Sequence, residues 1–259
     1  METSLPILGD ELPADLAVVE PADVSPPGSI SLRDTVEMLL KDRRKLDLFL
    51  RHDTAQRRIV PHLLTIAVCG FALYGVTATV LLNLLHRVGD FWLPLVPPSF
   101  WNDAGIGNLT AAYVVGLIVA NGICLPSFYF YGLLAGVRIT MLGATAHALK
   151  GMAAGAIALV GILPVYVPFA LAAVIWSDDV PLLAVCATIG LLLPFIAGLW
   201  GVVSLYEGFV ALADTIPCER RESRRCLLRR LVFAWSGCYT FVTPWVIYAL
   251  WHHLARAFS

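Results

Sequence analysis

Five long apolar stretches constrain this chain more than any other feature of its sequence. A helix needs about 20 consecutive apolar residues to cross the hydrocarbon core of a bilayer. The composition agrees, because 58% of the residues are hydrophobic and only 14% are charged, whereas soluble domains are about 25% charged. The sequence therefore predicts an all-α, polytopic membrane helix bundle with five transmembrane helices, at residues 60–85, 109–131, 153–176, 181–205 and 231–251.

The positions of lysine and arginine predict how this bundle is oriented, because cytoplasmic connections are enriched in both. Eight of them precede the first stretch, two lie between the second and third, and six lie between the fourth and fifth, which places sixteen on one side. The other side has only Arg87 and Arg256. We therefore expect the N-terminus in the cytoplasm and the C-terminus outside.

The chain before the first stretch divides into two parts. Residues 1–30 carry six acidic residues, five prolines and no lysine or arginine, which predicts a disordered acidic, proline-rich cytosolic tail. Residues 31–59 have apolar residues at steps of three and four, which predicts a cytosolic amphipathic helix with Ser31 and Asp34 as its capping box. The five-span membrane domain then covers residues 60–259.

This amphipathic helix is a candidate docking element. Its apolar stripe and basic residues could bind anionic lipid or a partner protein, and the sequence favours neither. The candidate docking residues are Leu39, Arg43, Arg44, Lys45, Leu46, Phe49 and Leu50.

Small residues predict where the membrane helices approach one another, because close backbone contact drives their association. Gly132 and Gly136 are four residues apart at the end of the second stretch, and Gly151 and Gly155 are four apart at the start of the third. We expect these two stretches to cross near the cytoplasmic face. Asn121 is the one strongly polar residue near mid-depth, where an interhelical hydrogen bond is favoured over a contact with a substrate.

Prolines interrupt four of the stretches, at Pro126, at Pro164 and Pro168, at Pro194 and at Pro244. Each proline removes a backbone hydrogen bond and leaves a carbonyl that a neighbouring helix or water must satisfy. Broken helices of this kind form the binding sites of some transporters, although proline is common in membrane helices generally.

Few residues suggest chemistry. No catalytic residues, metal ligands or nucleic-acid module can be identified, and we expect no cofactor. Glu207 lies where the fourth stretch reaches the cytoplasmic side, and we expect it to pair with an arginine there. Five histidines lie near the ends of the stretches, where haem ligation stays an open alternative to a plain interfacial role: His62, His86, His147, His252 and His253.

Two stretches, Leu125–Ala135 (LPSFYFYGLLA) and Gly198–Phe209 (GLWGVVSLYEGF), together with five spans and an acidic cytosolic N-terminus, resemble the Yip family of Rab-interacting membrane proteins. The resemblance implies a non-enzymatic role in binding partner proteins. It assigns no functional residue, because the family's cytosolic motif has no counterpart here.

Three functions remain in order of preference. The first is a non-enzymatic scaffold or accessory subunit of a larger membrane complex, whose partners are the lipid bilayer and other membrane-protein subunits but no nucleic acid. The second is a transporter or channel for a small solute, and the third a haem-binding electron-transfer anchor. Arginine outnumbers lysine fifteen to three, which is typical of GC-rich bacterial genomes, and we therefore expect a location in a bacterial cytoplasmic membrane.

Overall fold

A computed structural model describes residues 31–89, 106–134, 136, 139–176, 180–213 and 221–257, and within these the regular structure is helical. The tail at residues 1–30 lies outside the described residues. The helices are α1 (Leu32–Lys41), α2 (Arg43–Phe49), α3 (Asp53–Gly89), α5 (Ile106–Leu134), α6 (Met141–Trp176), α7 (Val180–Ala213) and α8 (Arg221–Ala257).

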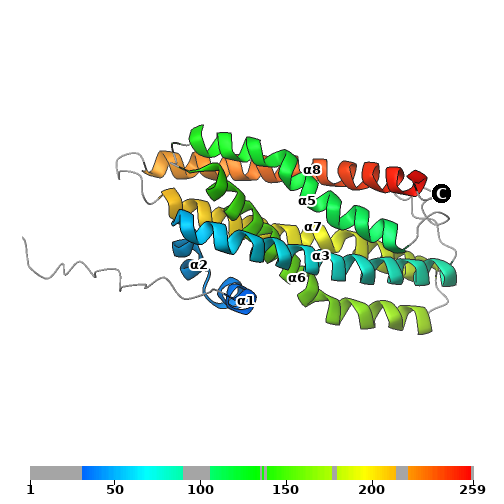
Figure 1. The fold of residues 1–259 in the computed structure, drawn as a ribbon. Helices are drawn as coiled ribbons and strands as arrows, with labels where there is room; N and C mark the ends of the chain where they lie inside the picture. Colours follow the sequence, from blue (N-terminus) through cyan, green and yellow to red (C-terminus); the bar gives the residue numbers. More distant parts are fainter. Residues whose placement is uncertain are drawn as a thin grey trace, which may run out of the picture.

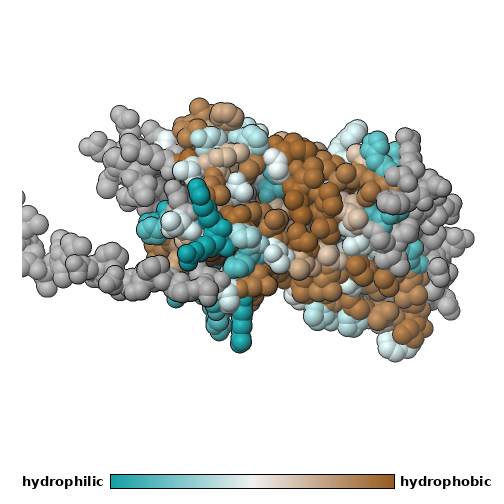
Figure 2. Space-filling model, in the orientation of Figure 1, coloured by the Kyte–Doolittle hydropathy of each residue, from teal (hydrophilic) through white to brown (hydrophobic). Residues whose placement is uncertain are grey.

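Five of these helices are long and apolar enough to cross a membrane, which confirms the predicted fold class. The spans are Thr54–Leu85, Thr110–Leu134, Met141–Trp176, Val180–Gly208 and Arg229–Leu254. They run side by side, and α1 and α2 lie toward the end opposite the C-terminus (Figure 1). Hydrophobic residues cover much of the middle of the bundle, whereas strongly hydrophilic ones gather near α1 and α2 (Figure 2).

The helices extend beyond the apolar stretches that predict them. The 36 residues of α6 span about 54 Å at 1.5 Å per residue, well over the ~30 Å hydrocarbon thickness. The polar segment from Met141 to Lys150 is the first part of this helix and runs without a break into the third apolar stretch. Similarly, α3 begins at Asp53, so Pro61 lies within the helix instead of in its first turn. Hydropathy locates the hydrocarbon layer, but the helices continue into the interface.

The predicted cytosolic helix is broken into two short helices. Ser31 and Asp34 form the expected capping box, and the Ser31 backbone N–H and hydroxyl lower the pKa of the Asp34 carboxyl by hydrogen bonding. The first break is at Asp42, whose φ of −139° and ψ of 71° are not helical and whose side chain caps α2. After α2 the chain turns into α3, and the buried Gln56 amide donates to the Leu50 carbonyl at 2.6 Å. The connection to the membrane domain is therefore fixed by polar contacts.

The apolar stripe of these two helices is covered by the protein itself. Leu39, Leu46, Phe49 and Leu50 are all buried, and Leu46 is 0% exposed. They belong to one hydrophobic cluster with residues of α3 and α6, among them Leu63 and Leu149. The prediction that this stripe docks onto an external partner or lipid is therefore corrected: the membrane domain provides the apolar surface that the stripe requires.

Small residues allow α6 to approach α3 and α7 closely, but they do not form the predicted contact. A Cβ on Gly70 of α3 would lie 2.9 Å from the Ala156 Cβ of α6, and one on Gly201 of α7 would lie 2.6 Å from the Gly151 carbonyl oxygen of α6. A Cβ on Gly155 would similarly approach the Ala197 carbonyl of α7, at 3.4 Å. Gly151 and Gly155 of α6 therefore pack against α7.

The expected crossing between the second and third stretches is wrong. α5 packs mainly against α8 and touches α6 much less, while α6 packs against α3 and α7. Gly116 makes the α5–α8 contact possible, because its Cβ would lie 2.6 Å from Ile247 Cγ1. Gly132 is buried within α5. Gly136 lies in a turn after α5 with a φ of 79°, so its role is conformational rather than the predicted helix packing.

One predicted consequence of the prolines is confirmed at Pro194. This residue has no N–H for the carbonyl of Gly190, four residues earlier in α7. The hydroxyl of Tyr74, from α3, donates a hydrogen bond to that carbonyl oxygen. The Tyr166 hydroxyl of α6 donates to the neighbouring Cys186 carbonyl at 3.1 Å. Two tyrosines thus attach α7 to α3 and α6 where its own hydrogen bonding is interrupted.

Candidate functional site: a cavity between the membrane helices

An elongated cavity of about 540 Å³ lies within the bundle, among α3, α5, α6, α7 and α8. This volume is within the range typical of small-molecule sites. Its lining on α8 extends from Phe233 to Trp251, which are about 27 Å apart along the helix. None of the described lining residues is Asp, Glu, Lys, Arg or His. The cavity is therefore long, apolar and uncharged.

The walls of the cavity differ in exposure. Its deep wall comes from α3, α5 and α6, and residues such as Phe71, Leu117 and Leu159 are less than a tenth exposed. On α7 and α8, by contrast, lining residues reach the surface: Leu199 is 66% exposed and Phe233 is 60% exposed. The cavity therefore opens between α7 and α8. Leu199 and Phe233 both lie within helix segments that are long and apolar enough to cross a membrane, so we expect the opening to face lipid.

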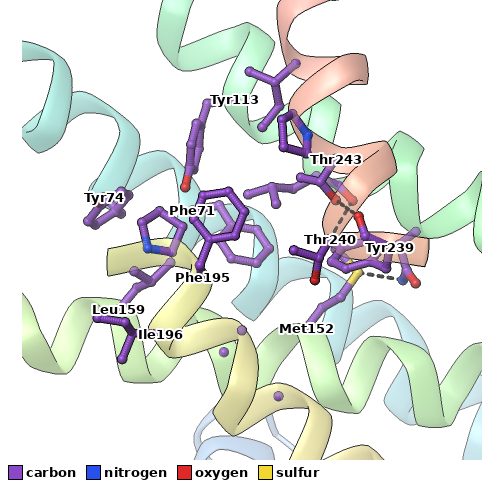
Figure 3. A pocket seen from close by; sticks show the side chains of 18 of the residues that line it. Phe71, Tyr74, Tyr113, Met152, Leu159, Phe195, Ile196, Tyr239, Thr240 and Thr243 are labelled. Carbon is purple, nitrogen blue, oxygen red and sulfur yellow. Dashed lines mark hydrogen bonds between the residues drawn. The ribbon is translucent and has the colours of Figure 1, made fainter. Parts of the chain in front are cut away.

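Aromatic side chains from different helices meet in the cavity (Figure 3). Tyr74 of α3 and Tyr113 of α5 have ring centroids 5.9 Å apart. Phe71 and Phe195 lie beside them, and Tyr239 of α8 lies toward the other side of the view (Figure 3). Aromatic residues supply large apolar area in a fixed geometry. The site is thus preformed by rings held on four helices, α3, α5, α7 and α8.

One face of α5 presents Tyr113, Leu117 and Asn121 to the cavity at intervals of four residues. Asn121 is 94% buried, being 6% exposed, and its Nδ2 donates to the Met152 sulfur of α6 at 2.6 Å. This contact is the interhelical hydrogen bond that the sequence predicts. The Oδ1 of the same amide is buried and has no hydrogen-bond partner. The hydroxyl oxygen of Tyr113 is also buried and also has none. Two polar atoms on one helix face therefore retain hydrogen-bonding capacity inside an apolar cavity.

The hydroxyls of α8 near Asn121 are already used as donors. Ser236 donates to the Val232 carbonyl, Thr240 to the Ser236 carbonyl and Thr243 to the Tyr239 carbonyl, at 2.7–2.8 Å. The Tyr239 hydroxyl donates across to the Leu117 carbonyl of α5 at 3.3 Å. These side-chain oxygens keep only their capacity to accept.

A second polar group lies at the end of the bundle near α2. The Lys150 ammonium of α6 is 2.5 Å from the Asp47 carboxylate of α2, and their side chains are 0% and 11% exposed. Gly208 of α7 provides the room, since a Cβ there would lie 2.8 Å from the His147 Nδ1 and 3.3 Å from the Asp47 Oδ1. This ion pair fastens α2 to α6.

The remaining candidate docking residues lie near this ion pair. Arg43 contacts the Glu207 carboxylate of α7 at 3.4 Å, which confirms the expected partner of Glu207. Arg44 and Lys45 are exposed, so contact with anionic lipid head groups stays a prediction for these two side chains.

The five histidines singled out in the sequence lie on three of the membrane helices. His147 is buried in α6, His62 is partly buried in α3, and His252 and His253 are exposed on α8. The side chain of His86 lies outside the described part. Among the side chains that the structure describes, no group of three or more His, Cys, Asp or Glu could hold a metal ion.

Sequence reasoning missed the cavity and the buried ion pair. The regular spacing of Tyr113, Leu117 and Asn121 shows one face of α5, but not that α7 and α8 leave space in front of it. Lys150 counted only as a topological charge, although a lysine at the edge of an apolar stretch needs a partner when buried. That partner, Asp47, is 103 residues away.

Comparisons with protein-family models, with curated proteins and with solved structures gave no match to this chain.

Proposed function

We propose that this protein binds an apolar, membrane-dissolved molecule in the cavity and holds it or carries it within the bilayer. The observation that carries the proposal is the lateral opening of an uncharged, aromatic-lined cavity between α7 and α8. A molecule dissolved in lipid reaches such a cavity without crossing water. This proposal narrows the predicted small-solute transporter to a class of apolar solutes.

The geometry also argues against a path for ions or polar solutes here. The described lining contains no charged residue, and moving an ion into such surroundings costs several kcal/mol without a counter-charge. The scaffold hypothesis loses the stripe on which it depended, because Leu46 and Phe49 are buried within the chain. It remains a prediction that would have to use the lipid-facing surface of the spans.

Obstructing the cavity tests the proposal. Gly198 of α7 lines the cavity, and a Cβ there meets no atom within 4 Å, so Gly198→Phe should place a ring at the opening without disturbing the fold. Gly237 of α8 also has open space around its Cβ but does not line the cavity, so Gly237→Phe is the matched control.

The measurement is the amount of apolar molecule retained by the protein purified in a mild detergent, counted by native mass spectrometry. We expect about one molecule bound to the unmodified protein and to Gly237→Phe, and roughly a tenfold lower apparent affinity for Gly198→Phe, a loss of about 1.4 kcal/mol. Equal retention by all three proteins, or no retention by any of them after loading with a long-chain hydrocarbon, would refute the proposal.

A further inference from the structure

We propose that the ligand of this cavity is an uncharged long-chain molecule carrying a hydrogen-bond donor, such as a hydroxyl or an amide N–H, which donates to the Oδ1 of Asn121. This inference rests on the proposed function and specifies its chemical class.

Asn121 has a buried oxygen that lacks a hydrogen-bond donor. Its side chain is 6% exposed and lines the cavity, and its Oδ1 has no partner while its Nδ2 is engaged by the Met152 sulfur. A buried acceptor without a hydrogen bond is unfavourable, because it has lost its water and gained nothing in return. A donor on the ligand removes that penalty.

The donors near Asn121 are already engaged, so the hydrogen-bonding capacity left at this level is that of acceptors. Cys124 of α5 accepts from Trp235 of α8 at 2.9 Å, and Leu117 accepts from Tyr239 at 3.3 Å. Asn121 lies between these two contacts and is therefore level with the segment 235–239 of α8. The Ser236 and Thr240 hydroxyls there already donate to their own helix.

Pro244 adds a further acceptor at the same level. It has no N–H to donate to the Thr240 carbonyl four residues earlier, and both residues line the cavity. The deep wall thus offers Asn121 Oδ1, and the wall near the opening offers oxygens of α8. A ligand group that only accepts hydrogen bonds would leave Asn121 Oδ1 unpaired, whereas a hydroxyl or amide N–H satisfies it.

The described lining of the cavity carries no charge. No described lining residue could neutralise an ionic head group, so the part of the ligand that enters must be uncharged. The length of the cavity, about 27 Å along α8, fits an extended chain better than a compact ring system. Together these features select a long apolar chain with a small neutral donor.

The test compares ligands that share one chain and differ in the head group: oleyl alcohol, oleyl methyl ether and oleyl sulfate. The alcohol donates, the ether of nearly equal size only accepts, and the sulfate is anionic. The full-length protein is placed in nanodiscs of phosphatidylcholine, whose head group has no hydrogen-bond donor. The bound fraction is measured by native mass spectrometry at a series of mole fractions of each probe.

We expect the alcohol to bind about threefold to tenfold more tightly than the ether, the effect of one neutral hydrogen bond, and the sulfate to bind least. Asn121→Leu keeps the branched shape and the number of side-chain heavy atoms but removes the acceptor, and should abolish the preference for the alcohol while leaving ether binding unchanged. Asn83→Leu is the control and should retain the preference for the alcohol. Asn83 of α3 does not line the cavity, and its amide donates to the Thr79 carbonyl of its own helix.

Two results would overturn this inference while sparing the proposed function. One is that alcohol and ether bind equally to the unmodified protein, with both weakened by Gly198→Phe. The other is that the preference persists in Asn121→Leu. If no probe binds in a manner that Gly198→Phe weakens, the proposed function itself fails.

Discussion

The Nζ of Lys150 lies 2.5 Å from the Oδ1 of Asp47, which joins a short helix outside the spans to the third membrane helix through a buried charge pair. The two residues are 103 positions apart, so this contact helps to fix where α2 lies on the membrane domain.

Breaking this pair should destabilise the protein strongly. Asp47→Leu leaves the Lys150 ammonium buried without its counter-charge, and such changes cost about 3–5 kcal/mol. Replacing both residues, in Asp47→Leu with Lys150→Met, should recover most of the loss because apolar groups of similar volume pack in their place. The midpoint of thermal unfolding in detergent, measured for the two single variants and the double variant, gives the coupling energy.

The exposed pair between Glu37 and Lys41 is the control, since both side chains are more than half exposed. Glu37→Gln should leave the unfolding midpoint unchanged. A stable Asp47→Leu variant, with the same midpoint as the unmodified protein, would contradict the role given to the buried pair.

Because the apolar stripe of α1 and α2 is buried, charged substitutions in it should destabilise the fold. If the stripe bound an external partner instead, the same substitutions would release that partner and leave the fold stable. Leu46→Glu with Phe49→Glu places two carboxylates in the hydrophobic cluster, and we expect a loss of several kcal/mol together with faster proteolysis of residues 31–52. Leu40→Glu with Leu48→Glu is the matched control, because these leucines are 62% and 54% exposed. An unchanged unfolding midpoint for the first pair of substitutions would restore the docking interpretation.

The contact between α6 and α7 predicts opposite effects for two glycines three residues apart. Gly201→Ala places a Cβ 2.6 Å from the Gly151 carbonyl oxygen, so the helices must separate, at a cost of about 1–3 kcal/mol. Gly198→Ala meets open space and should be neutral, or stabilise by about 0.5–1 kcal/mol, because alanine favours the helix. Thermal unfolding of the two variants checks the difference. If Gly201→Ala is as stable as Gly198→Ala, the close approach is not present.

The orientation predicted from the lysines and arginines can be tested by labelling single cysteines in a background without the six native ones. An impermeant maleimide added to intact cells should label a cysteine at Ser259, near the predicted external C-terminus, and miss one at Ser223. Permeabilising the cells should expose Ser223 to the reagent. Labelling of Ser223 in intact cells would reverse the topology.

The sequence predicts the membrane spans well because hydropathy acts locally. A long apolar run is removed from water whichever helices pack beside it. Each of the five predicted stretches accordingly falls within a long helix. Helix partners depend on distant residues instead. Gly151 has the spacing of a packing glycine, but nothing near it in the chain indicates that it faces Gly201 on α7 rather than Gly132 on α5.

The site was harder to predict than the fold for the same reason. Asn121 can be selected from the sequence because an amide at mid-depth needs a partner. No sequence pattern indicates that its partner is the Met152 sulfur, and none indicates that a cavity lies beside it. The apolar stripe of α1 and α2 shows what periodicity cannot predict. The spacing of its residues predicts that Leu46 is covered, but not that the covering surface belongs to the same chain.

The contacts of α6 with α7 determine which part of the bundle can move. Only three residues separate the end of α6 at Trp176 from the start of α7 at Val180, and nearer the opposite end of the two helices Gly151 meets Gly201. Because α6 and α7 are held together near both ends, they cannot rotate relative to each other. α8 is packed mainly on α5 and far less on α7, so a wider entrance requires α8 to move away from α7 together with α5, while the α6–α7 pair stays still. A crosslink between α7 and α8 should therefore trap whatever occupies the interior, whereas one between α6 and α7 should have no effect on exchange.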